Sequence, residues 1–426
     1  VHVSQHSINK LMFTFIRFIL KQIGIIIYKH CFTTRIPFLM KEYLSGYVNI
    51  LKTIIGSGIL YIPMLFKSYG AISTFFLMCL SATLSMVGQI IFLYCNAFLN
   101  DRSTNITSLA RESVPRTRFL VDFFVFFKCF GVSTSYLIII RELIPNLIQT
   151  VFGESVLARP KVALLIFLCF ISPITYFRQL KNLKYTSSIG LIAISFILFF
   201  SMYNFIKHGS LEHVTLYEPI TIEWLKGLGT FVFAFTCHQN LISVQNEVVD
   251  NSPDRMKKIV YATTATSLVI YMVFGFTNYA LYATNMHDNV LKSYPNDHIT
   301  LFLHFLYVCV MGFSYPLQIN PARVYMYNLL GFNTKKRNNN LVHAVITTLL
   351  LASTYVLTIT GLNLGEMYAF VGATASTMIC LIFPLLFYYN MGLERKRWLI
   401  IFGCIGFVFG SCVFALSLFK LLKHQN

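Results

Sequence analysis

Long apolar segments follow one another along almost the whole chain, and short polar stretches separate them. Each is about 20 residues long or longer, which is the length that a helix needs to cross the hydrocarbon core of a bilayer. Membrane β-barrel strands would be about 10 residues long with alternating polarity, which these segments do not show. The pattern predicts an all-α polytopic membrane protein with eleven transmembrane helices, at 45–69, 71–98, 119–145, 160–177, 185–207, 223–246, 258–282, 299–327, 341–362, 367–390 and 396–420.

Two of the predicted spans are interrupted near their middle. The first carries Gly56-Ser57-Gly58, and the sixth carries the polar run Thr236-Cys237-His238-Gln239-Asn240. Irregular backbone at membrane depth is tolerated only where it lines a cavity or is buried in protein. Broken helices at corresponding positions in two halves point to a transporter binding site. The alternatives are a tight helix contact at the glycines and a buried neutral imidazole at His238.

Composition supports the membrane prediction. Of the 426 residues, 56% are hydrophobic and only 12% are charged, about half the fraction usual in soluble domains. The net charge of +18 lies in short loops and not on a folded basic module, which argues against nucleic-acid binding. With a cytosolic N-terminus, 23 Lys and Arg fall on the cytosolic side and six on the other side, as the positive-inside rule requires.

The N-terminal residues 1–43 form a separate prediction. They contain six Lys and Arg, and two of these interrupt their apolar stretch. No small-residue cleavage site follows, so the segment is a poor signal peptide. We predict a basic cytosolic extension at 1–43 and a transmembrane transporter domain at 44–426.

Other chemistry has little support in the sequence. None of the ten cysteines forms a C-x-x-C pair, so no metal site or cofactor is predicted. Neither H-E-x-x-H nor G-x-S-x-G occurs, so no enzyme is predicted. Asp122 and Lys128 are interpreted as interfacial anchors. The adjacent Arg141 and Glu142 are either an internal ion pair or interfacial residues.

Five motifs in order carry a resemblance to a known family. They are NILKTIIGSGILYIP, CFGVSTSYLIIIRELIP, LKNLKYTSSIGL, FAFTCHQNLISVQNEVVDNS and SYPLQINPAR. Together they resemble the amino acid/auxin permease family, in the branch that holds the system A/N-type neutral amino acid transporters and the fungal vacuolar amino acid transporters. The similarity covers most of the chain from about Val48 to Tyr389.

The resemblance implies a LeuT-like fold, with two inverted repeats of five helices, broken first and sixth helices and one final helix. It implies that the substrate carboxylate meets backbone N–H groups around Gly56, Ser57 and Gly58, and that the amine meets carbonyls near Phe235–Cys237. This arrangement is favourable because the N-terminus of a half-helix attracts an anionic group and its C-terminal carbonyls attract a cation. The substrate-binding candidates are Ile55, Gly56, Ser57, Gly58, Phe235, Thr236, Cys237, His238, Gln239 and Asn240.

One departure from the family concerns coupling. Sodium-coupled members carry Asn where this chain has Lys52, and Thr near the position of Ser314. An ammonium at Lys52 could occupy the space of a sodium ion, which favours proton coupling; snorkelling to the cytosolic face is the alternative. Lys52, His238 and Ser314 are therefore the coupling candidates.

The predicted function is secondary active transport of amino acids, coupled to protons and independent of sodium, by alternating access. The absence of an arginine in spans one and six favours neutral substrates. A vacuolar or lysosomal-type membrane is favoured, with the plasma membrane as the alternative. The second hypothesis is a transporter-like amino acid sensor that signals through its N-terminal tail.

Overall fold

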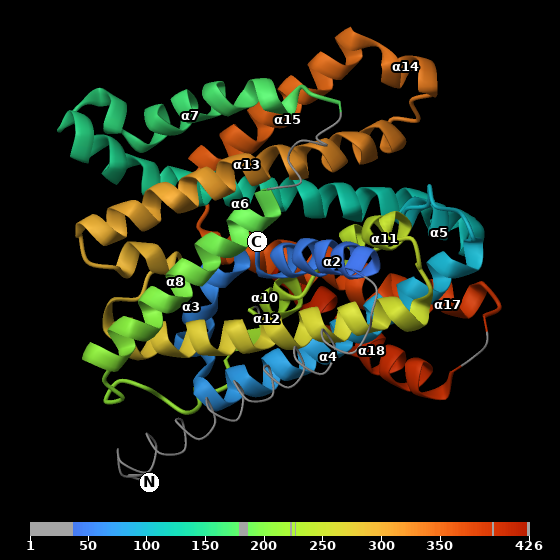
Figure 1. The fold of residues 1–426 in the computed structure, drawn as a ribbon, viewed down its shortest axis with the longest axis horizontal. Coiled ribbons are helices and arrows are strands. Elements are labelled where there is room, and N and C mark those ends of the chain that lie inside the picture. The colour runs from blue at the N-terminus through green and yellow to red at the C-terminus, as the bar shows by residue number, and fades with distance from the viewer. Residues whose placement is uncertain (1–36, 179–185, 222–223, 226, 394–395, 424–426) are drawn as a thin grey trace.

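The computed structural model describes residues 37–178, 186–221, 224–225, 227–393 and 396–423. Most of the predicted extension 1–43 therefore lies outside the described residues. The helices form one bundle, with the halves of both interrupted helices at its centre (Figure 1). They are α2 (Pro37–Ile55), α3 (Ile62–Tyr69), α4 (Ala71–Leu99), α5 (Ile106–Ser113), α6 (Arg118–Phe152), α7 (Pro160–Thr175), α8 (Thr186–His208), α10 (Leu228–Ala234), α11 (His238–Glu247), α12 (Pro253–Tyr282), α13 (His298–Leu329), α14 (Thr334–Asn338), α15 (Asn340–Ile359), α16 (Leu364–Val371), α17 (Phe383–Asn390) and α18 (Arg397–Lys423).

The described helices confirm the eleven predicted spans. Nine segments of the described part of the chain are long and apolar enough to cross a membrane. The other two are the shorter α7 and the sixth span, which is divided into α10 and α11. The first span is divided as well, into α2, a 3-10 turn at Gly58–Tyr61 and α3. Both predicted interruptions are therefore present.

Burial separates central helices from those at the periphery. In the most apolar 18 residues of each span, the buried share is 78% in α6 but only 28% in α8 and in α18. α8 exposes large apolar side chains such as Ile192 and Phe199, which suits a surface that faces lipid. α6 packs along α13 and also contacts α15, α7 and α16, so it is a central helix of the bundle.

The tenth span contains an irregularity that the sequence did not predict. Between α16 and α17 the backbone is π-helical at Gly372–Ser376 and again at Met378–Ile382. π-Helical turns are rare, and they occur often at functional sites. Here they bring the tenth span against α10.

Candidate functional site

The break in the first span exposes backbone donors. α2 ends at Ile55, and Gly56 has φ +36°, a left-handed conformation that glycine adopts without a steric cost. The next helical turn begins at Gly58, and first-turn amides have no acceptor within their own helix. None of the hydrogen bonds of the described residues uses the amides of Ser57 or Gly58. These amides are available to an anionic group.

The break in the sixth span exposes backbone acceptors. α10 ends at Ala234 and α11 begins at His238. The carbonyl of Phe235 accepts a hydrogen bond from Ser85 Oγ at 2.7 Å, and that of Cys237 accepts from the amides at the start of α11. Among the described residues, no donor reaches the carbonyl of Thr236. This carbonyl is available to a cationic group.

One tyrosine connects the two breaks. The hydroxyl of Tyr271, on α12, lies 2.7 Å from the carbonyl oxygen of Ile54 and 3.0 Å from that of Ala234. These carbonyls lie near the last residues of α2 and α10, where the helices leave acceptors without intrahelical donors. Tyr271 is fully buried. It was not a candidate from the sequence because it lies within an ordinary apolar run.

We expect Tyr271→Phe to weaken amino acid binding about tenfold. The substitution leaves the ring in place and removes the donor shared by two buried carbonyls, and a buried unsatisfied group costs about 1–3 kcal/mol. The measurement is the Kd of the purified protein for its substrate. Tyr315→Phe is the matched control, because that buried hydroxyl pairs with Thr354, between α13 and α15. Equal effects of the two variants would contradict a positioning role for Tyr271.

A cavity lies between the two breaks. The first span, α6, the sixth span and α13 contribute its lining residues, which are Thr53, Ile54, Gly56, Ser57, Gly58, Lys128, Val132, Tyr136, Phe233, Thr236, Gln239 and Gln318. Its lining mixes backbone groups with polar and apolar side chains, which suits a small polar molecule.

The structure brings five of the predicted binding residues to this cavity, namely Gly56, Ser57, Gly58, Thr236 and Gln239. The Oε1 atom of Gln239 is buried and receives no hydrogen bond from the described residues. The other candidates lie behind the lining. Ile55, Phe235 and Cys237 are fully buried, and Asn240 donates to Thr53 Oγ1 at 2.8 Å. That contact ties α11 to α2.

The structure places His238 away from the cavity. Its Nδ1 atom lies 3.2 Å from Cys380 Sγ, and its ring packs edge-on against Phe92. A Cβ atom at Gly88 would lie 2.9 Å from His238 Nε2, so the ring contacts the backbone of α4 closely. The imidazole is enclosed between α4 and the tenth span.

Lys52 and Ser314, two of the coupling candidates, contact each other directly. Lys52 Nζ donates to Ser314 Oγ at 2.9 Å, and that hydroxyl donates in turn to the carbonyl of Val310 at 2.6 Å. Only 8% of Lys52 is exposed, so its amine does not snorkel to the membrane surface. Gly190 on α8 leaves room for its stem, since a Cβ atom there would lie 3.3 Å from Cε. The amine is therefore held between α2, α8 and α13.

Lys128 is a site residue that sequence reasoning missed. The interpretation as an interfacial anchor was wrong, because this side chain is only 2% exposed and lines the cavity. Its Nζ donates to Ser376 Oγ at 3.0 Å and lies 3.7 Å from the centre of the Phe233 ring. A desolvated cation–π contact contributes about 2 kcal/mol.

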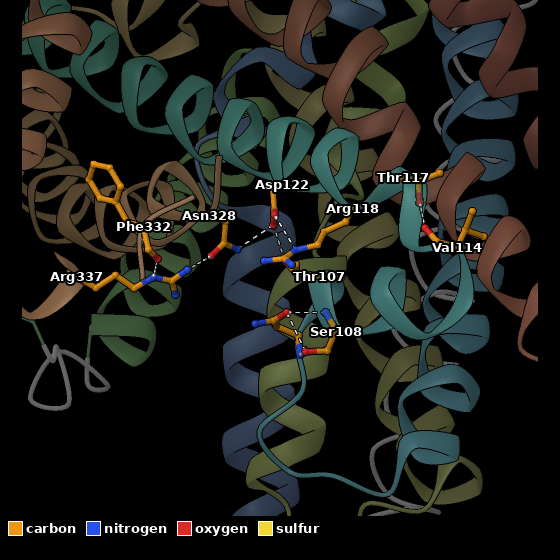
Figure 2. Close-up of polar contacts among 10 residues, drawn as sticks. Thr107, Ser108, Val114, Thr117, Arg118, Asp122, Asn328, Phe332 and Arg337 are labelled. Atoms are coloured by element: carbon orange, nitrogen blue, oxygen red, sulfur yellow. Dashed lines mark hydrogen bonds and ion pairs between the residues drawn. The ribbon is translucent and has the colours of Figure 1, made fainter. Parts of the chain in front are cut away.

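Asp122 is not an interfacial anchor either. Its carboxylate is 2% exposed and accepts hydrogen bonds from Thr107 at 2.6 Å and from Asn328 at 2.9 Å, with Arg118 3.9 Å away (Figure 2). Arg337 donates to Asn328 Oδ1 at 2.8 Å. These contacts fasten the start of α6 to α5 and to the end of α13, remote from the cavity.

Arg141 and Glu142 do not form an ion pair in the described part of the chain. Arg141 donates to the carbonyls of Thr358 and Leu362, near the end of α15. Glu142 accepts from Asn289 Nδ2 at 3.1 Å. Each residue therefore joins α6 to a different neighbour. Arg323, on α13, is buried and donates to the carbonyl of Thr175.

The segment between α12 and α13 packs over the 3-10 turn of the first span. Asp288 fastens this segment to α16, because its carboxylate accepts from the amide of Gly365 at 3.2 Å. Burial raises the pKa of the Asp288 carboxyl, and nearby Glu366 acts in the same direction; the Gly365 amide, His287 and Lys292 lower the pKa. A raised pKa means that the folded state binds the proton more tightly than the unfolded chain does.

The stability contributed by Asp288 is therefore fully present below its unfolded pKa and is lost as the pH rises through its folded pKa. We expect Asp288→Asn, which can still accept from Gly365, to remove this loss. Its melting temperature should exceed that of the wild type by about 1–2 °C at neutral pH and match it at acidic pH. A constant difference across the pH range would contradict this assignment.

No three His, Cys, Asp or Glu side chains of the described residues lie together in a way that could hold a metal ion.

Comparison with known proteins identifies the family of this chain. Residues 41–423 match the family model described as "Transmembrane amino acid transporter protein".

Two fungal proteins and one solved structure are among the similar proteins. Vacuolar amino acid transporter 5 of Schizosaccharomyces pombe is 30% identical over 82% of this chain and 84% of its own length. Vacuolar amino acid transporter 5 of Saccharomyces cerevisiae is 27% identical, with coverages of 82% and 88%. The crystal structure of MhsT in complex with L-phenylalanine has a TM-score of 0.57 at 12% identity, covering 88% of this chain and 98% of that one. The expected LeuT-like fold is confirmed.

Proposed function

Since the chain belongs to the family of transmembrane amino acid transporter proteins, we propose that it is a secondary active transporter of amino acids. The observation that carries the proposal is the pairing of two half-helix breaks around one cavity. One break offers the amides of Ser57 and Gly58, and the other offers the carbonyl of Thr236. An α-amino acid carries the complementary groups, a carboxylate and an ammonium, on one and the same carbon atom.

The substrate carboxylate is proposed to accept from the amides around Gly56, Ser57 and Gly58, where the helix dipole favours an anion. The amine is proposed to donate to the Thr236 carbonyl and to the free Oε1 atom of Gln239. Because each half-helix is a separate rigid piece, the site can open to one side of the membrane at a time, as alternating access requires.

The coupling ion is proposed to be a proton carried by Lys52. This amine lies between α2 and α13 and hydrogen-bonds Ser314, where the family resemblance puts a sodium ion in other members. While this amine is protonated, its positive charge takes the place of the sodium ion, so we propose that transport is independent of sodium. His238 stays a prediction, and its contacts with Phe92 and Cys380 are those of a packed side chain.

The membrane is proposed to be vacuolar or lysosomal in type, because the two fungal relatives are named vacuolar transporters. With a cytosolic N-terminus, a proton gradient from an acidic lumen would drive amino acids into the cytosol. The plasma membrane is the alternative. The sensor hypothesis depends on the 1–43 extension, most of which lies outside the described residues. The prediction of a neutral substrate was based on the residues of spans one and six only. It did not take into account Lys128, which α6 brings to the cavity.

The test is uptake of labelled amino acids into liposomes that contain the purified protein, under an imposed pH gradient, with and without sodium. The panel includes glutamine, histidine, tyrosine, isoleucine, glutamate and lysine. Uptake that follows the proton gradient and ignores sodium is the expected result. A requirement for sodium would overturn the coupling proposal and keep the transporter. Binding without flux by folded protein would favour the sensor.

A further inference from the structure

Lys128 contributes a charge to the cavity. The proposed binding of the substrate carboxylate and amine by backbone groups does not use this charge. Lys128, Val132 and Tyr136 lie four residues apart on α6, so they form one stripe on the helix face that lines the cavity. Of the described residues that line the cavity, Lys128 alone carries a charged side chain. Among the described lining residues, its side chain is therefore the group that can present a full charge to a substrate.

This charge has no counter-ion among the described residues. No carboxylate lies within ion-pair distance of Lys128, and its two contacts, with Ser376 Oγ and the Phe233 ring, are with neutral groups. An ammonium has three donors, and one hydrogen bond and one ring contact leave capacity for another acceptor. A buried ammonium is poorly stabilised by neutral contacts alone, so an anion that enters the cavity gains a strong interaction there.

The position of Lys128 matches the side chain of a bound amino acid. Ser57 Oγ lies 3.4 Å from Ser135 Oγ, which places the break in the first span at the level of Ser135 on α6. Lys128 precedes Ser135 by seven residues, or about 10 Å along the helix axis. A substrate whose carboxylate meets the break, and whose side chain extends along α6, brings the end of that side chain towards the Lys128 ammonium.

We propose that Lys128 is a specificity-determining residue whose ammonium binds a carboxylate at the end of the substrate side chain, so that the transporter prefers dicarboxylic amino acids. The inference rests on the proposed function and names the substrate class of the same site. It replaces the expectation of neutral substrates, which was drawn from spans one and six.

The experiment measures binding to the purified protein by ligand-induced shift in melting temperature. The ligands are L-glutamate, L-glutamine and L-norleucine, which have similar length and differ in the charge and polarity of the side-chain end. We expect the wild type to bind glutamate at least about tenfold more tightly than the other two. Lys128→Met should lose this preference and bind norleucine as the wild type does, whereas Lys128→Arg should keep glutamate first.

Lys67→Met is the matched control, because that lysine is near the end of α3 and is not part of the cavity lining. Glutamine or norleucine binding to the wild type as tightly as glutamate would overturn the inference, even if Lys128→Met does not fold. So would a glutamate preference that survives in folded Lys128→Met. If folded wild type binds none of a full amino acid panel and transports none, the proposed function fails instead.

Discussion

We expect uptake driven by a pH gradient to fall at least about tenfold when Lys52 is replaced by methionine, while exchange of substrate across the membrane continues. Methionine fills a similar volume along Gly190, so the packing between α2, α8 and α13 is largely kept. It cannot carry a proton or donate to Ser314. The measurement compares accumulation under a pH gradient with exchange of labelled for unlabelled substrate at equal pH, in the same liposomes.

The physical reason lies in linkage between proton binding and conformation. A proton drives transport only if its binding favours one of the two access states over the other. We propose that Lys52 meets this condition, because its amine joins α2, half of a broken helix, to α13 through Ser314. A proton on this amine changes the contact between those two elements, and such a change alters the balance between states.

The controls separate loss of coupling from loss of folding. Lys67→Met removes a lysine of the same span outside this contact and should leave gradient-driven uptake unchanged. Lys52→Arg keeps a permanent charge and should also lose gradient-driven uptake. Unchanged accumulation in folded Lys52→Met would exclude this residue from coupling, and attention would return to His238.

The two breaks could be predicted from the sequence because their residues contradict the surrounding pattern. Gly56 and Gly58 disfavour a helix, and five consecutive polar residues cannot all face lipid. What the sequence could not assign was the direction of each side chain. Successive residues of a helix point about 100° apart, so only residues three or four apart share a face. Thr236 and Gln239 reach the cavity, while His238 between them points towards α4 and Cys380.

The charged residues of α6 were misjudged for a different reason. α6 is central in the bundle, with 78% of its most apolar stretch buried, and its apolar residues do not gather on one face, so hydropathy does not distinguish its buried faces. Asp122 and Lys128 therefore looked like residues near the end of a lipid-facing helix. Their partners, Asn328 and Ser376, are more than 200 positions away in the sequence. The π-helical turns that carry Ser376 have no recognised sequence signature either.

Helix packing beside the site leads to the second large effect. Gly372 faces Gly229 across the contact between the π-helical segment and α10, and a Cβ atom on Gly372 would overlap the carbonyl oxygen of Gly229. A Cβ atom on Gly229 would overlap the backbone of Ala373. Small residues allow two membrane helices to approach to backbone contact. Neither backbone can move easily, because Phe233 of α10 also packs on Tyr368 of α16.

We therefore expect Gly372→Ala to lower the melting temperature of the purified protein by about 3 °C, because overpacking against backbone lies at the upper end of the usual cost of about 1–3 kcal/mol, and a chain of 426 residues shifts by about 1 °C per kcal/mol. The matched control is Gly406→Ala on α18, where the nearest atom to an added Cβ is 3.6 Å away, an ordinary contact. That variant should melt within about 1 °C of the wild type. If both variants melt alike, the close approach of α10 and the tenth span is not needed for stability. If only Gly372→Ala lowers the melting temperature, the contact that holds Phe233 beside the cavity requires a glycine at position 372, with no side-chain methyl group.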